Sequence, residues 1–327
     1  MAALLEVDRL AVSFVGQGDA VTAVRGVSLS VNAGERVGLV GESGSGKSVT
    51  AQAVMRLLPQ TAVTKGTITF DGRNVLNFDS AELARWRGSD IGMIFQDPMS
   101  SLNPLMRIGT QITEVLRRHR GLSKPAAREQ AVRLLRTVGI TDAHERMRDY
   151  PNAFSGGMRQ RVCIAIAAAC APRLIIADEP TTALDVTIQA QVLDLLDALA
   201  DQHGTAVVLI SHDLGVVSSF CDRILIMYAG QVVESGTTAE IINSPRHPYT
   251  RALLDSIVRL EGELPTRLTT IPGAPPIGTP ADDMCSFAGR CPRVQERCLS
   301  EEPALLPGPH PRSAACHFPL DLTVVSR

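Results

Sequence analysis

Four short runs of apolar, largely β-branched residues recur along the chain, each followed by polar or glycine-containing sequence. They are Arg36–Val40, Asp90–Phe95, Leu174–Asp178 and Ala206–Ser211. Their nearly continuous hydrophobicity is typical of strands that are buried on both faces. Helical patterns lie between the runs, as at Val186–Gln202. The alternation predicts an α/β fold around a mainly parallel sheet.

Two hairpins accompany this core, with turns predicted at Asp71-Gly72 and at Ala229-Gly230. They predict an antiparallel β subdomain, and the second hairpin predicts that the sheet ends near Gly236. Downstream of residue 108 and up to about residue 151 the pattern is helical, with a basic amphipathic run at residues 124–139. We interpret this part as an inserted helical lobe of about residues 100–165 whose charges form a solvated helix face.

The C-terminal part differs in composition from the rest. The sequence RHPYTRALLDSIVRL, residues 246–260, precedes the proline- and glycine-rich IPGAPPIGTP, residues 271–280, which predicts a linker. We expect a main domain over residues 1–240 and a small cysteine-containing extension over residues 241–327.

Composition restricts the class of protein. Of the 327 residues, 45% are hydrophobic and 20% charged, and the net charge is −2, which fits a globular protein and argues against a general polyanion binder. The N-terminal sequence contains Glu6 and Asp8 and no long apolar run, so we expect a mature cytosolic start. The most apolar stretch, Val162–Ala177, is short for a membrane span and contains Pro172 and Arg173.

A phosphate-binding loop is the strongest motif. GESGSGKS follows a predicted strand and precedes a helical run, and it satisfies G-x-x-x-x-G-K-[ST]. Its glycines let backbone N–H groups surround phosphate oxygens, the lysine can reach the β and γ phosphates, and the last serine can bind Mg²⁺. The candidate residues are Gly41, Glu42, Ser43, Gly44, Ser45, Gly46, Lys47 and Ser48.

Polar side chains follow three of the other predicted strands. Asp178 and Glu179 end one strand and should point to opposite sides, so we assign Asp178 to Mg²⁺ and Glu179 to the attacking water. Alone, such a pair could be a solvated strand edge. Gln96 and His212 also follow strands, and the carboxyl ends of parallel strands form one ligand crevice.

A second candidate anion site lies in FSGGMRQR, where Ser155, Gly156 and Gly157 begin a helix. Serine is also a common helix cap without any ligand. Because one nucleotide does not need two such sites, the economical interpretation is that this one faces a nucleotide held by another subunit.

These motifs, in this order, resemble those of the ATP-binding cassette (ABC) ATPases, which are P-loop NTPases, over about residues 4–250. The resemblance implies that ATP and Mg²⁺ are the ligands and that Glu179 is the catalytic base. It implies that the other catalytic residues are Lys47, Gln96 and His212. It implies that Mg²⁺ is bound by Ser48, Gln96 and Asp178. Further nucleotide contacts would come from Phe14, by stacking on adenine, and from Asp185 in the segment Ala183–Asp185. The chain departs from the commonest signature, LSGGQ, at Phe154 and Met158.

Four longer motifs are more particular. FSGGMRQR, IFQDPMSSLNP, EPTTALDVTIQAQ and RHPYTRALL together resemble the ATPase subunits of bacterial dipeptide and oligopeptide importers. The resemblance implies an enzyme that hydrolyses ATP to power peptide import from the cytoplasmic face of the membrane. Its implied partners are a second, paralogous ATPase subunit, two transmembrane permease subunits contacted by the segment after Gln96, and indirectly an extracytoplasmic substrate-binding protein.

Three alternative functions remain. Soluble ABC ATPases that act on nucleic acid or the ribosome typically have two cassettes or large insertions, and this chain has neither, so we expect no nucleic-acid partner. A purely regulatory module would be expected to lack Glu179 or His212. Importers of nickel chelates or glutathione belong to the same family and stay open.

Seven cysteines divide into two groups. Cys163, Cys170 and Cys221 lie in apolar or helical sequence, as small hydrophobic residues do. The others follow the spacing C-x5-C-x6-C-x17-C, which lacks a zinc knuckle and, in a cytosolic protein, disfavours disulfides. Iron–sulfur sites are more permissive in spacing, and the resemblance implies a [4Fe–4S] cluster, with zinc or no metal as alternatives. The candidate ligands are Cys285, Cys291, Cys298 and Cys316, and Arg290, Arg293 and Arg297 would offset the cluster's negative charge.

Overall fold

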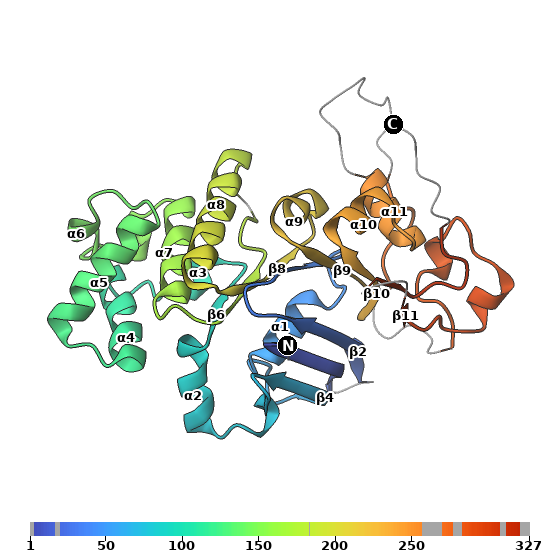
Figure 1. Ribbon diagram of the computed structural model, residues 1–327, viewed down its shortest axis with the longest axis horizontal. Helices are drawn as coiled ribbons and strands as arrows, with labels where there is room; N and C mark the ends of the chain where they lie inside the picture. Colours follow the sequence, from blue (N-terminus) through green and yellow to red (C-terminus); the bar gives the residue numbers. More distant parts are fainter. Residues whose placement is uncertain are drawn as a thin grey trace. The chain divides into compact units, whose positions relative to one another are not determined.

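The computed structural model describes residues 3–16, 20–182, 184–256, 270–276, 283–307 and 312–320. The chain forms two compact units (Figure 1). Unit 1 consists of Met1–Leu4, Val31–Glu35 and Asn77–Ile210, and unit 2 consists of Leu5–Ser30, Arg36–Leu76 and Ser211–Arg327.

Unit 1 contains three parallel strands in the order β8-β7-β6, as the apolar runs predict. Helix α7 packs closely on β6, because a Cβ on Gly92 would come within 2.5 Å of the Ala167 carbonyl oxygen. The elements of this unit are α2 (Ser80–Ser89), β6 (Ile91–Ile94), α3 (Pro98–Ser101), α4 (Ile108–Arg120), α5 (Lys124–Thr137), α6 (Ala143–Arg146), the 3₁₀ turn Pro151–Ala153, α7 (Gly156–Ala168), β7 (Leu174–Asp178), α8 (Val186–His203) and β8 (Ala206–Ser211).

The helices predicted between Gly109 and Pro151 are present and lie together as α4, α5 and α6 (Figure 1). Ser123 caps α5, with its hydroxyl accepting from the Ala126 N–H at 3.4 Å. The helices enclose a core that includes Ile112 and Leu116, whereas the basic residues of α5 are exposed. The basic run is therefore a solvated helix face, as predicted.

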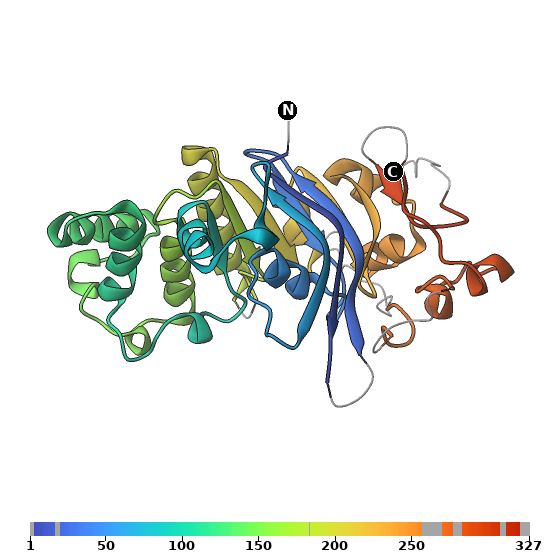
Figure 2. The same cartoon turned by 90° about the horizontal axis from the view of Figure 1, so that it is seen from below.

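Unit 2 contains an antiparallel sheet in the order β2-β1-β4-β5 (Figure 2). Strands β1 and β4 pair from Leu5 opposite Phe70 to Phe14 opposite Ala62. The predicted turn at Asp71-Gly72 joins β4 to β5, and both turn residues have positive φ. The elements before residue 77 are β1 (Leu5–Phe14), β2 (Val21–Val31), β3 (Arg36–Val40), α1 (Lys47–Val54), β4 (Ala62–Phe70), β5 (Arg73–Asn74) and the 3₁₀ turn Val75–Asn77.

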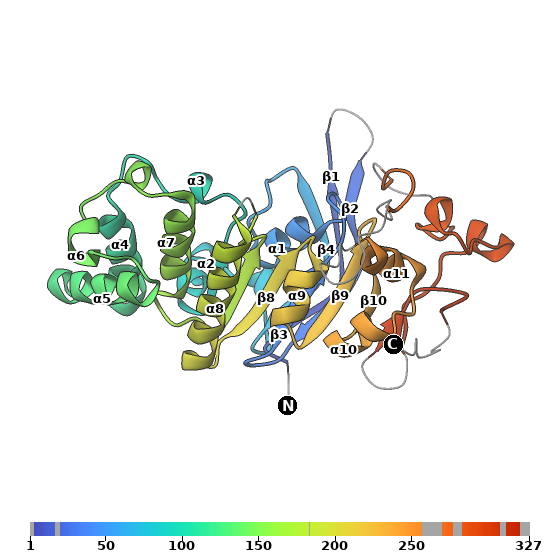
Figure 3. The same ribbon diagram turned by 90° about the horizontal axis from the view of Figure 1, so that it is seen from above.

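The second part of unit 2 orders its strands β11-β12-β10-β9-β3. Strand β9 pairs parallel to β3, and the predicted turn at Ala229-Gly230 joins β9 to β10. The elements after residue 210 are α9 (Leu214–Phe220), β9 (Arg223–Tyr228), β10 (Gln231–Thr237), α10 (Thr238–Asn243), α11 (Pro248–Asp255), 3₁₀ turns at Ala288–Arg290 and Glu296–Leu299, β11 (Leu306–Pro307) and β12 (Ser313–Ala314). Figure 3 shows α10 beside β10.

The prediction that the sheet ends near Gly236 is wrong. Glu234 and Ser235 of β10 pair with Ala314 and Ser313 of β12, so a segment close to the C-terminus extends the sheet. The outer edge of β10 carries unpaired backbone donors and acceptors, which a returning strand can satisfy. A two-residue strand has no hydrophobic period, so the pattern along the chain does not predict it.

The RHPYTRALL motif places a buried histidine at the start of α11. The His247 Nδ1 atom accepts a hydrogen bond from the Tyr249 N–H at 3.0 Å, and the Glu234 carboxylate accepts from the backbone N–H groups of Arg246 and His247. His247 is 2% exposed, and its burial lowers its pKa to about 4. The imidazole is therefore neutral in the folded protein at physiological pH.

This buried histidine predicts acid sensitivity. The unfolded chain binds a proton at His247 below about pH 6.5, whereas the folded chain does so only near pH 4, so unfolding becomes easier as the pH falls through that window. The cost is about 1.4 kcal/mol per pH unit. Asparagine can cap the helix without titrating, so the thermal midpoint of His247→Asn should fall less between pH 7 and pH 5 than that of the unsubstituted protein. Equal falls would contradict this role.

Candidate functional site

The phosphate-binding loop of unit 2 follows β3 and leads into α1. Gly46 precedes the helix with φ of 99°, a conformation that L side chains rarely adopt. A Cβ on Gly41 would come within 2.2 Å of the Met227 carbonyl oxygen, so the loop lies directly on the end of β9. The loop is also held at Ser45, whose carbonyl oxygen accepts from the Gly230 N–H at 3.0 Å.

Lys47 is buried within this loop, with 4% exposure. Its Nζ atom donates to the carbonyl oxygens of Gly41 at 2.8 Å and Glu42 at 2.9 Å. These bonds hold the ammonium over the loop at the N-terminus of α1, where backbone N–H groups and the helix dipole favour an anion. Unit 2 thus has the geometry of a phosphate site.

Unit 1 brings together two of the predicted catalytic side chains. The Gln96 Nε2 atom donates to the Glu179 Oε2 atom at 2.9 Å, and the Thr182 hydroxyl donates to the same oxygen at 2.8 Å. Asp178 ends β7 and is 4% exposed. Glu179 has φ of 48°, a backbone conformation that is uncommon for residues other than glycine. Asp178 is therefore buried, whereas Glu179 is only partly buried and accepts hydrogen bonds from Gln96 and Thr182.

The signature segment begins α7. Ser155 is the N-cap, its hydroxyl accepting from the Met158 N–H at 3.4 Å, and both Ser155 and Gly156 are exposed. Phe154, in contrast, is buried in the lobe core, with Arg146 5.7 Å above its ring. The side chain at this position of the signature therefore packs within the lobe.

The remaining predicted nucleotide residues occupy several elements. Phe14 ends β1 and is half-buried, Asp185 caps α8 by accepting from the Ile188 N–H at 2.9 Å, and His212 follows β8 and is exposed. Ala183 lies outside the described residues.

The four C-terminal cysteines line one small cavity, together with His247, Phe287 and Arg293. The Cys285 N–H donates to the Cys298 carbonyl oxygen at 2.9 Å, which closes the segment on itself. Burial raises the pKa of Cys285 to about 11, and the negative charge of the other three thiolates adds to the rise. Within the described ranges, however, no group of three or more His, Cys, Asp or Glu is arranged to hold a metal ion.

The three arginines that would offset a cluster's negative charge have different surroundings. Arg293 lines the cavity, but Arg290 forms two hydrogen bonds with the Glu42 carboxylate, and Arg297 pairs with Glu301 on the surface. Arg290 prefers Glu42 because a guanidinium and a carboxylate match in a bidentate geometry.

Sequence reasoning also missed residues that contact the functional groups. Thr182 lies three residues after Glu179 and holds its carboxylate. The Tyr249 hydroxyl accepts from the Glu42 N–H at 3.0 Å and so fixes the phosphate-binding loop. The only sequence signal for Tyr249 was its place in RHPYTRALL.

Solved structures show the same architecture. The dimeric ATP-binding cassette MJ0796 bound to ADP and Pi, a post-hydrolysis state, matches with a TM-score of 0.65 and 30% identity over 72% of this chain and 98% of that one. The ABC transporter family profile matches residues 24–182, and that of the oligopeptide/dipeptide transporter C-terminal region matches residues 233–298. The chain has the fold of an ABC ATPase, as predicted. Throughout the described ranges, no helix is both long and apolar enough to cross a membrane.

Curated relatives narrow the class. The oligopeptide transport ATP-binding protein OppD of Salmonella typhimurium is 48% identical over 97% of this chain and 94% of its own length, and OppD of Bacillus subtilis is 50% identical over 92% and 85%. The probable D,D-dipeptide transport ATP-binding protein DdpD of Escherichia coli is 49% identical over 97% of each chain. The chain belongs to the family of oligopeptide transport ATP-binding proteins, which are ATPases of ABC transporters.

Proposed function

We propose that this chain powers the import of dipeptides and oligopeptides from the cytoplasmic face of the membrane. The similarity to oligopeptide transport proteins over nearly the whole length carries this proposal, because it includes the C-terminal region profile at residues 233–298 as well as the cassette. The energy comes from ATP hydrolysis by two such subunits acting together.

Each chemical role is assigned to a described side chain. The loop Gly41–Ser48 holds the phosphates, with Lys47 neutralising the β and γ oxygens, and Phe14 stacks on adenine. By the resemblance to ABC ATPases, Ser48, Gln96 and Asp178 would hold Mg²⁺. When bound, Mg²⁺ would offset the charge on the phosphate oxygens.

Hydrolysis is an in-line displacement at the γ phosphorus. Glu179 takes a proton from the attacking water and His212 helps to orient that water, the new P–O bond forms, and the bond to the bridging oxygen of ADP breaks. The hydrogen bonds from Gln96 and Thr182 hold the Glu179 carboxylate in one orientation for this step. The products are ADP and phosphate.

A second ATPase subunit completes the site. Ser155, Gly156, Gly157 and Asp185 would contact the nucleotide of the partner, which we infer to be a paralogue. Ser155, Gly156 and Asp185 are exposed, and all four residues lie at helix N-termini, which supports this role.

The segment after Gln96 would contact the two permease subunits, which in turn receive substrate from an extracytoplasmic binding protein. Asp97 caps the short helix α3 by accepting from the Met99 N–H at 2.8 Å, which presents the apolar side chains that follow. Met99 is 46% exposed and Leu105 is 86% exposed. Exposed apolar side chains such as these two are typical of a protein contact surface.

The C-terminal cysteines are proposed to bind a [4Fe–4S] cluster. Support comes from the shared cavity of Cys285, Cys291, Cys298 and Cys316. A cluster is wider than a single ion, so its ligands need not converge on one point as zinc ligands do. When bound, it would supply either a structural link or a redox centre.

Co-purification and transport test the proposal together. A tagged chain, extracted from membranes in mild detergent, should bring down a paralogous ATPase and two membrane subunits, and the reconstituted complex should take up labelled peptides. Uptake of a nickel chelate or glutathione instead would change the substrate, and recovery of ribosomes or DNA without membrane subunits would contradict the proposal.

One substitution maps the permease contact. Leu105→Glu should abolish recovery of the membrane subunits without reducing ATP binding, because it places a charge at the most exposed apolar side chain of the segment. Leu299→Glu is the matched control, since Leu299 is 59% exposed in the C-terminal region. Equal recovery with both variants would contradict the assigned surface.

A further inference from the structure

An ion pair joins the phosphate-binding loop to the cysteine segment. The Arg290 Nη1 atom donates to Glu42 Oε2 at 2.6 Å, and Nη2 donates to Glu42 Oε1 at 3.0 Å. The side chains are 7% and 25% exposed, so this pair is largely shielded from solvent. Glu42 is the second residue of the loop, and Arg290 immediately precedes Cys291.

Other contacts hold the guanidinium in place. Its Nε atom donates to the Pro272 carbonyl oxygen at 2.8 Å, and the group lies 5.8 Å from the centre of the Tyr228 ring. A guanidinium fixed on several edges has little freedom left to lose when it pairs with a carboxylate. Arg290 is therefore pre-positioned by the C-terminal segment.

The same segment contacts the loop through aromatic rings. Phe287, which is 2% exposed, packs against Tyr228 and Tyr249 with ring centres 5.3 Å apart in each case. The Tyr249 hydroxyl in turn accepts from the Glu42 N–H. Both the backbone and the carboxylate of Glu42 are thus held by residues of the C-terminal region.

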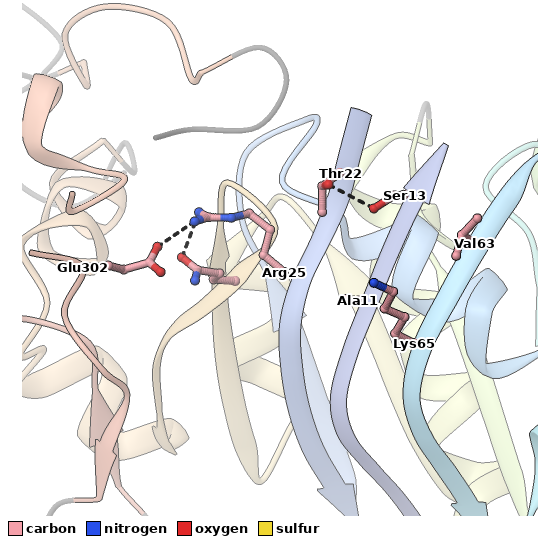
Figure 4. A pocket seen from close by; sticks show the side chains of 8 residues that line it. Ala11, Ser13, Thr22, Arg25, Val63, Lys65 and Glu302 are labelled. Atoms are coloured by element: carbon pink, nitrogen blue, oxygen red, sulfur yellow. Dashed lines mark hydrogen bonds and ion pairs between the residues drawn. The ribbon is translucent and has the colours of Figure 1, made fainter. Parts of the chain in front are cut away.

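A separate tether fixes the cysteine segment to strand β2. Figure 4 shows Arg25 reaching to Glu302, and the two side chains form an ion pair at 2.9 Å. Arg25 also donates to the Ser286 hydroxyl at 3.0 Å. Because Ser286 and Glu302 lie on either side of Arg290 in sequence, Arg290 is held from both flanks.

We propose that Arg290 is a positioning residue for ATP binding: it neutralises Glu42 and fixes the loop, so that the cysteine segment sets the affinity of the phosphate site. This inference rests on the proposed role of the loop. Without Arg290, the Glu42 carboxylate would stand unpaired in a loop that receives a polyanion, and both its charge and its freedom would weaken binding.

If Arg290 acts by neutralising Glu42, then removing the Glu42 charge should restore the ATP affinity that is lost when Arg290 is replaced. Arg290→Ala in the purified full chain should weaken the binding of a fluorescent Mg-ATP analogue by about five- to tenfold, with kcat changed much less than KM. The double variant of Arg290→Ala with Glu42→Gln lacks the unpaired carboxylate, so it should bind more tightly than Arg290→Ala alone and recover most of the lost affinity. If Arg290→Ala does not fold, Arg290→Lys should show about a two- to threefold loss because it lacks the bidentate fork, again relieved by Glu42→Gln.

Two controls separate the possible failures. Arg297→Ala removes a neighbouring arginine whose pair with Glu301 is on the surface, so its affinity should not change. Lys47→Ala should lose nucleotide binding; if it binds normally, the assignment of the loop itself is wrong, and this inference with it. If Lys47→Ala fails to bind but Arg290→Ala binds normally, or the double variant stays as weak as Arg290→Ala, only the role of Arg290 is overturned.

Discussion

Replacing Glu179 by glutamine should abolish ATP turnover while ATP binding remains. The amide has the size of the carboxylate and can still meet Gln96 and Thr182, which hold the side chain now at 2.9 Å and 2.8 Å. It cannot take a proton from water at neutral pH. General bases contribute about 10²- to 10⁴-fold to rate, so we expect kcat to fall by about a thousandfold.

Binding should survive because the phosphates are held elsewhere. In the proposed assignment, Lys47 and the backbone of the loop Gly41–Ser48 attract ATP, and Glu179 is not part of this loop. ATP-bound subunit pairs should therefore accumulate, which sedimentation can detect, while phosphate release measures turnover. Glu129→Gln is a matched control, because Glu129 pairs with Arg133 on the surface of α5. Normal turnover in Glu179→Gln would remove the assignment of the base.

The strands of the core could be predicted from sequence because burial dictates their composition. The runs Leu174–Asp178 and Ala206–Ser211 coincide with β7 and β8 residue for residue. Strands buried on both faces must be apolar throughout, so their ends show as the first polar residues. The first polar residues, Asp178 and Ser211, end the two strands, and the candidate residues Glu179 and His212 follow them directly, which is why fold and candidate site could be predicted together.

Contacts between distant segments could not be predicted in this way. Arg290 and Glu42 are 248 positions apart in the sequence. The local sequence suggests another role for each of them, because Arg290 lies beside a cysteine and Glu42 lies in a glycine-rich loop. A charged residue can satisfy its charge with any opposite partner that the fold brings within reach. Phe154 illustrates the same point for packing, since its place in the signature gave no indication that its ring enters the lobe core.

Protein purified and handled without oxygen should be brown and contain about four irons per chain. The four cysteines line one cavity, and burial raises the pKa of Cys285, Cys291 and Cys316, so without a positive centre these thiols stay protonated at neutral pH. Iron would displace the thiol protons, because a coordinating cysteine binds as the thiolate, and the iron–sulfur bonds would outweigh the cost of deprotonation.

Substitution separates a bound cluster from adventitious iron. Cys298, 7% exposed, lies between the others in sequence, so Cys298→Ser should lose the visible absorbance and most of the iron. Cys170→Ser, which changes a buried thiol of unit 1, should keep both. Iron analysis and the absorption spectrum are the measurements. A colourless, iron-free preparation with unchanged ATPase activity would contradict the cluster. A content of about one zinc per chain would instead show that the four cysteines form a zinc site.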